Sequence, residues 1–221
     1  LDALFAAAEK AIENGSTILV LSDRGVNRER APIPALLAVS GLHHYLIRQG
    51  KRTRVGMLLE SGEPRTVHHF CTLIGYGAQA VNPYMAFASI ADMINEGMLT
   101  DIAYSEAAEG YVKSATKGVV KVMAKMGIST IRSYCGAQIF EAEGLKKSFV
   151  DRYFTWTDTR IEGVGLDIIA QESLARHAHT YPAMQADGKA LEVGGHYQWR
   201  KDGEYHLFNP KTVHLLQRSV R

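Results

Sequence analysis

The chain has 221 residues, of which 46% are hydrophobic and 22% are charged, so it is long enough to bury a core and is not expected to be disordered. Its 25 lysines and arginines nearly balance 23 acidic residues, a balance that gives no electrostatic footprint for nucleic acid. The sequence contains no run of about 18 apolar residues, so we predict no transmembrane helix and no membrane partner. Cys71 and Cys135 are too few for an iron–sulfur or zinc site, and we expect free thiols.

A strand, a polar turn and a helix form the unit around which the chain is organised. An amphipathic helix over 1–14 comes first, followed by the apolar run Ile18–Leu21. Such a run is typical of a strand that is buried on both faces in a parallel sheet. The polar turn Ser22–Gly25 ends the strand, and a long helix is predicted over Leu36–Gln49. Pro34 suits the start of that helix, because its missing N–H would be unpaired there.

Strand and helix patterns then alternate up to His179. The further predicted strands are 54–59, 80–82, 128–131 and 154–157, and the further predicted helices are 65–75, 84–96, 105–126 with a break near Gly118, 137–143, 146–153 and 165–179. Strands that alternate with helices of this length require right-handed crossovers and a parallel sheet. We therefore predict an α/β fold with a parallel sheet flanked by helices.

The composition changes at Tyr181 and divides the chain into two predicted parts, an α/β domain over 1–180 and an extension over 181–221. Residues 182–195 lack a periodic pattern and are expected to form a linker. The next segment, 196–208, alternates around an Asp-Gly pair, which predicts a β-hairpin. A final helix is predicted from Asn209 and Pro210 to the chain end. The chain lacks a starting methionine and ends inside this helix, so we expect a piece of a longer protein.

Polar side chains are predicted to gather at one edge of the sheet, because open parallel sheets bind ligands beyond the carboxyl ends of their strands. Seven residues are candidates for a binding or channel-lining surface there: Asp23, Arg24, Ser61, Glu63, Ser133, Tyr134 and Gln138. Strand ends are also polar simply because loops meet water, so residue type alone assigns none of them a role.

Other signals of chemistry are weak. The adjacent histidine pairs, 43–44 and 68–69, point about 100° apart on a helix, so neither pair binds one metal ion by itself. The sequence contains no phosphate-binding loop, nucleophile elbow or metal-ligand spacing. The residues by themselves therefore predict a fold and a candidate edge, but no catalytic residue and no metal site.

Longer segments resemble the large subunit of glutamate synthases. The segments that carry the resemblance include SDRGVN at 22–27, APIPALLAV at 31–39, ESGEPR at 60–65, KGVVKVM at 117–123 and RIEGVGL at 160–166. The resemblance runs over nearly the whole chain in the family's order. It implies the later half of the family's central domain, with the connection towards its FMN domain.

In that family an amidotransferase domain releases ammonia from glutamine, and a tunnel delivers the ammonia to a flavin domain. There 2-oxoglutarate is aminated and the imine is reduced by FMN, with electrons that arrive from an NADPH-linked subunit or ferredoxin through an iron–sulfur cluster. This sequence has no N-terminal catalytic cysteine, no cysteine cluster and no recognisable flavin motif. The resemblance therefore implies no cofactor and no catalytic residue in this piece.

The role implied by the resemblance is a structural bridge between the amidotransferase and FMN domains, with the seven strand-end candidates lining the ammonia tunnel or clamping the domain interfaces. The compartment implied is the cytoplasm, or the plastid stroma in a photosynthetic eukaryote. Two alternatives stay open at this point. One is a stand-alone α/β enzyme that binds a small anion or a flavin at its strand ends, and the other is a scaffold module that docks separate catalytic subunits.

Overall fold

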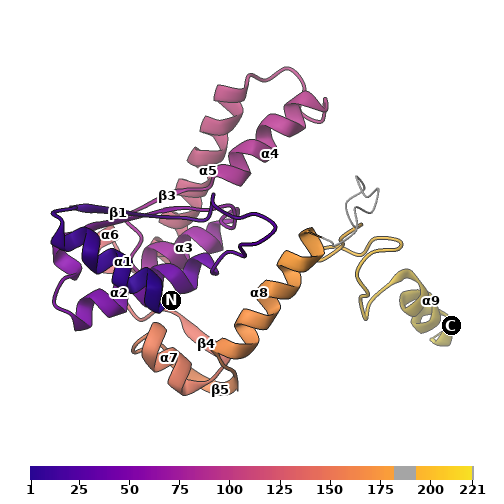
Figure 1. The fold of residues 1–221 in the computed structure, drawn as a ribbon. Helices are drawn as coiled ribbons and strands as arrows, with labels where there is room; N and C mark the ends of the chain where they lie inside the picture. The colour runs from indigo at the N-terminus through magenta and orange to yellow at the C-terminus, as the bar shows by residue number, and fades with distance from the viewer. Residues whose placement is uncertain (182–192, 221) are drawn as a thin grey trace. The chain divides into compact units, whose positions relative to one another are not determined.

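The structure, a computed structural model, describes residues 1–181 and 193–220 (Figure 1). The chain divides into two compact units, Leu1–Tyr181 and Pro182–Arg221. The strands of the first unit are β1 (Ile18–Ser22), β2 (Gly56–Glu60), β3 (Ala80–Asn82), β4 (Glu141–Leu145) and β5 (Asp158–Val164). Its helices are α1 (Asp2–Glu13), α2 (Ala35–Arg48), the short 3-10 helix η1 (Arg52–Arg54), α3 (Val67–Gly75), α4 (Tyr84–Asn95), α5 (Tyr104–Lys125), α6 (Ile131–Tyr134), α7 (Lys147–Tyr153) and α8 (Leu166–Thr180). The described part of the second unit contains α9 (Pro210–Ser219).

The central feature of the first unit is a parallel sheet in the order β1-β2-β3, which confirms the α/β prediction. Helices α1, α2 and α3 lie on one face of this sheet (Figure 1). The main core forms between the sheet and these helices and extends to α7. Among its most deeply buried members are Phe5, Ile12, Leu42, Leu46, Met57, Leu59 and Val150.

The other face of the sheet is exposed among the described residues. In β1, Ile18 and Val20 are each 58% exposed, whereas the alternate residues Leu19 and Leu21 are buried. The prediction that this strand is buried on both faces is therefore wrong for this chain. An unalternated apolar run shows that both faces tolerate burial, but a second layer of helices has to exist before the outer face is covered.

The segment after α5 departs most from the predictions. The expected strand 128–131 is instead a turn that leads into α6, since the Thr130 side chain accepts the backbone N–H of Ser133 and caps that helix. The expected helix 137–143 does not form, because Gln138 has a φ of +55°, outside the helical region. Strands β4 and β5 follow instead and pair in parallel with two register shifts. Residues 154–157 form a turn before β5 rather than a strand.

In the described part of the second unit, residues 193–220, the predicted hairpin is reduced to a turn. The N–H of Gly203 donates to the carbonyl of Arg200, and Asp202 has a φ of +62°. Between the two arms of this described segment, the one backbone-to-backbone bond runs from the Glu204 N–H to the Gly194 carbonyl, at 2.7 Å, which is too little to build a strand ladder. The hairpin prediction is wrong, and most of the predicted linker lies outside the described residues.

The predicted final helix is confirmed as α9. Its cap is local and complete, because the Asn209 side chain accepts the backbone N–H groups of Lys211 and Thr212 at 3.0 and 3.1 Å.

Helix α5 runs unbroken through Gly118, where it packs closely against α3, so the predicted break is wrong. A methyl group at Gly118 would overlap the Val67 side chain, whereas a methyl group at Gly110 meets nothing within 4 Å. We expect the overlap in Gly118→Ala to lower the free energy of unfolding by about 1–3 kcal/mol. The higher helix propensity of alanine should offset up to about 1 kcal/mol of this loss. The matched control Gly110→Ala should raise it by about 0.5–1 kcal/mol. Urea unfolding of both variants measures this, and a stabilising Gly118→Ala would contradict the packing.

Candidate functional site

The ends of β1 and β2 are tied together by Asp23. Its carboxylate accepts the Ser61 hydroxyl at 2.6 Å and the backbone N–H of Gly62 at 3.1 Å. Ser61 is fully buried, and its Oγ in turn accepts the N–H of Glu63 at 3.1 Å. Because a buried hydroxyl is costly to leave unpaired, these bonds fix the turn after β2 in one conformation.

Glu63 extends the network to the start of α2. The first N–H groups of a helix lack partners within the helix, and Pro34, which precedes α2, has no side chain that can supply one. The Glu63 carboxylate accepts the Ala35 N–H at 2.8 Å and fills this role from a distant part of the chain. Burial raises the pKa of Glu63, and the nearby Asp23 carboxylate raises it further, while the Ala35 N–H opposes both.

Arg24 sits on the outer side of the same edge. Its Nε is 2.7 Å from the Glu60 carboxylate, which also accepts the Ser22 hydroxyl at 2.7 Å, and its guanidinium lies 4.2 Å from the centre of the Tyr84 ring. The contact with Arg24 lowers the pKa of Glu60. Burial, reinforced by the Asp23 carboxylate, raises the pKa of Tyr84 to about 12, so its hydroxyl stays protonated at neutral pH.

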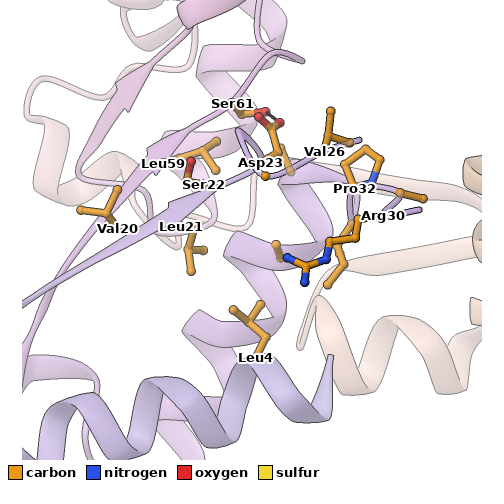
Figure 2. Close-up of a pocket in the computed structure, with 15 residues that line it drawn as sticks. Leu4, Val20, Leu21, Ser22, Asp23, Val26, Arg30, Pro32, Leu59 and Ser61 are labelled. Carbon is orange, nitrogen blue, oxygen red and sulfur yellow. Dashed lines mark hydrogen bonds between the residues drawn. The ribbon is translucent and has the colours of Figure 1, made fainter. Parts of the chain in front are cut away.

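Beside this network opens a pocket of about 470 Å³ (Figure 2). Asp23 and Ser61 lie together at one end of the pocket. Its apolar wall includes Leu4, Leu21 and Leu59. The Arg30 side chain extends beside the pocket, and no acidic side chain of residues 1–181 or 193–220 pairs with it. The pocket thus combines apolar walls with one guanidinium whose charge is not neutralised within the described chain.

The structure brings four of the seven candidates together: Asp23, Arg24, Ser61 and Glu63. The predicted placement of the other three is wrong, because 128–131 is not a strand and has no strand end to bring them to this edge. Ser133 bonds with Thr130 around the start of α6. Tyr134 is fully buried beside Cys71, where burial raises its pKa. Gln138 lies in the loop after α6 and lines a different pocket.

Two residues at the edge, Arg30 and Tyr84, were missed by sequence reasoning, and Glu60 belongs to a predicted strand-end cluster without being one of the seven candidates. Glu60 had a usable signal, since it directly follows a predicted strand. Arg30 lies in a charged loop, and Tyr84 is the first residue of a helix. Their positions in the sequence do not indicate that their side chains lie near the end of β1.

The described residues lack the features of two other kinds of site. Within 1–181 and 193–220, no three or more histidine, cysteine or acidic side chains gather as a metal site would require. In the same residues, no helix is both long and apolar enough to cross a bilayer. Cys71 and Cys135 are free thiols, as predicted.

Comparison with known proteins shows which sequences this chain is similar to. Residues 1–146 match the family model of the glutamate synthase central domain. The chain is 54% identical over 219 residues to the "Glutamate synthase [NADPH] large chain" of Bacillus subtilis, which covers 99% of this chain and 14% of that protein. It is 40% identical over 230 residues to the "Glutamate synthase [NADH]" of Saccharomyces cerevisiae, covering 100% of this chain and 11% of that one.

A plant relative extends the comparison. The "Ferredoxin-dependent glutamate synthase 2, chloroplastic" of Arabidopsis thaliana is 39% identical over 226 residues, covering 97% of this chain and 14% of that protein. The chain thus spans 11% to 14% of the length of these three relatives.

Proposed function

Because the chain belongs to the glutamate synthase central-domain family, we propose that it serves a glutamate synthase as a structural bridge between the amidotransferase and FMN domains and as part of the ammonia-tunnel wall. The parent enzyme would form L-glutamate from glutamine and 2-oxoglutarate. The family match over residues 1–146 and the similarity over almost all of the chain support this proposal.

The observation that carries the structural role is how the charges at the strand ends are used. Asp23 holds Ser61 and Gly62, Glu63 holds the start of α2, and Arg24 holds Glu60. Each charged group thus stabilises the chain's own backbone or a neighbouring side chain, instead of presenting a nucleophile with its base. Such an edge favours a rigid wall over a reaction centre.

The pocket beside this edge suits passage of a small neutral molecule. Its walls are largely apolar, and the one acidic side chain among its lining residues, that of Asp23, is already hydrogen-bonded. Neutral ammonia would meet few charged groups able to trap it as ammonium. We therefore assign the four strand-end residues Asp23, Arg24, Ser61 and Glu63 to the tunnel wall or the adjoining domain interface.

The proposal places the cofactors elsewhere in the parent protein. FMN and the iron–sulfur cluster would belong to other domains of the enzyme, and the electron donor would be an NADPH-linked subunit or ferredoxin. The relatives' names specify NADPH, NADH and ferredoxin variants, so the donor differs between members. The cytoplasm is the proposed compartment, or the plastid stroma for a plant protein, as the name of the Arabidopsis relative indicates for that protein.

Neutralising Arg24 tests this function. In a full-length enzyme that contains this chain, Arg24→Gln should let glutamine hydrolysis exceed glutamate formation, because the edge loses the cation that holds Glu60 and Tyr84 in place. The measurement is the ratio of glutamine hydrolysed to 2-oxoglutarate consumed. Lys113→Gln, which removes an exposed ion pair on α5, is the matched control and should keep the ratio at one. One-to-one coupling in Arg24→Gln would refute the assignment.

Arg30 favours a second candidate function, a site for a small anion or a flavin phosphate in the same pocket. The test is the absorbance spectrum of the 221-residue protein alone and after addition of FMN and removal of the excess. A protein that retains flavin colour, and loses it in Arg30→Gln, would establish this second function and remove the structural one. A colourless protein supports the bridge.

A further inference from the structure

A second pocket, of about 270 Å³, lies where the C-terminal ends of α2 and α3 meet the loops at 134–140 and 155–157. In a parallel α/β unit the helices run opposite to the strands, so this is the other end of the unit from Asp23 and Ser61. One wall is a pair of stacked rings, Tyr76 and Phe140, with centroids 5.6 Å apart. Trp156 also lines the pocket, so a flat ring would find aromatic faces here.

His43 and His44 are two of the polar side chains that line this pocket, together with Arg48, Gln138, Thr155 and Thr157. His43 Nδ1 lies 2.9 Å from Nε of Arg52, and since an arginine only donates, His43 must accept there and carry its own proton on Nε2. His44 Nδ1 lies 2.9 Å from the carbonyl oxygen of Ser40, which only accepts, so a neutral His44 carries its proton on Nδ1. His44 Nε2 is then a bare acceptor. The hydrogen bonds with stated distances on these two rings, within residues 1–181 and 193–220, all use Nδ1, and His44 also interacts with the backbone of Tyr153.

Both imidazoles are neutral at physiological pH. Burial, helped by the charge of Arg52, lowers the pKa of His43 to about 3. Burial also lowers the pKa of His44. The close approach of Gly77, whose φ is +113°, holds the His43 ring in place, because any side chain at that position would overlap it. The pocket therefore presents one fixed N–H donor and one fixed acceptor on neighbouring rings, whose centroids are 5.1 Å apart.

Two backbone conformations at this pocket are unusual. Among the described residues, only four that are not glycine have positive φ, and two of these, Gln138 at +55° and Trp156 at +68°, line this pocket. Trp156 is also 79% exposed, so most of its large apolar ring lies in water. Such conformations gather at ligand sites, where the surrounding structure maintains them.

We propose that this pocket binds a planar cyclic amide, a flat ring in which an N–H and a C=O stand side by side. The ring N–H would donate to His44 Nε2, the carbonyl would accept the Nε2–H of His43, and the ring faces would lie against Trp156 and the Tyr76–Phe140 wall. A cavity of about 150 Å³ holds benzene, so this pocket has room for two fused rings. The site is distinct from the strand-end edge and does not depend on the proposed function.

The test uses 2-quinolone, a bicyclic cyclic amide, and N-methyl-2-quinolone, which has nearly the same shape but no N–H. Binding to the 221-residue protein is followed through the two tryptophan indole N–H signals in ¹H–¹⁵N NMR spectra. We expect 2-quinolone to shift the Trp156 signal with a dissociation constant of about 1 mM or below, as befits a compound of this size. The Trp199 signal, which comes from the other unit, should not move.

The N-methyl compound should bind at least about fivefold more weakly, since it loses one hydrogen bond. Trp156→Ala, a change at an exposed side chain that should not disturb folding, should weaken binding of 2-quinolone by about tenfold, as measured by ligand-observed saturation transfer. Equal affinity for the two compounds would overturn the donor–acceptor pair. A Trp199 shift that parallels that of Trp156, or no shift at all, would overturn the site.

Discussion

Replacing Asp23 with alanine is expected to lower the free energy of unfolding by about 3 kcal/mol. The carboxylate accepts two charge-assisted hydrogen bonds, from the Ser61 hydroxyl and the Gly62 N–H, and each such bond contributes about 1.5–3 kcal/mol. Ser61 is fully buried, so no water can replace the lost partner without local opening. The transition midpoint in urea, with an unchanged slope, measures the loss.

The neighbouring residue is the matched control. Arg24→Ala removes an ion pair whose side chains are 54% and 25% exposed, and such pairs contribute about 1 kcal/mol or less. Ser61→Ala should cost less than Asp23→Ala, since the carboxylate keeps the Gly62 N–H. The combined Asp23→Ala/Ser61→Ala variant should be more stable than the sum of the single losses predicts. Additive losses would mean that the two side chains do not act as a pair.

Lowering the pH from 7 to 5 is expected to destabilise the first unit by about 2 kcal/mol through His43 alone. Its pKa is about 3 in the folded chain but 6.5 when exposed, so between these values only the unfolded state takes up the proton. The contribution of the neutral His43 ring to the free energy of unfolding is complete above pH 6.5 and is lost as the pH falls from there towards 3. The pKa values of His44 and His69 are lowered too and add to the effect, whereas the raised pKa of Glu63 opposes it.

A variant without the titrating ring isolates this contribution. His43→Gln keeps an acceptor for Arg52 but cannot take up a proton, so its stability should fall less steeply from pH 7 to pH 5. The measurement is urea unfolding of both proteins at a series of pH values and constant ionic strength. Parallel stability curves for the two proteins would show that His43 is not the group that responds.

The sequence was most informative where local pattern and tertiary packing agree. Ile18–Leu21 and the helix beginning near Ala35 were predicted within one residue, because apolar runs and proline positions act locally. The segment 128–145 was mispredicted because its outcome depends on single backbone features. The Thr130 cap and the positive φ of Gln138 leave no periodic signal in the sequence.

The candidate site shows the same division. Asp23 and Ser61 follow directly after strands, so the parallel topology alone places them side by side. The roles of Arg30 and Tyr84 depend on how a loop and a helix turn back towards β1, which residue type does not encode. The second pocket could not be predicted from the sequence. Two loops from later in the chain meet His43 and His44 there, and the tautomers of the two rings follow from hydrogen bonds that only the structure shows.

Helix α7 has a consequence for how a nascent chain acquires its structure. Val150 is fully buried in the main core, and the Ser40 hydroxyl in α2 donates to the carbonyl of Tyr153 at 2.5 Å, across 113 residues of sequence. A nascent chain that has emerged from the ribosome only as far as residue 146, where the family match ends, does not yet include this helix. During that interval α2 would expose apolar surface that α7 later covers, and the buried residues of the main core would all be available only when Phe154 has emerged.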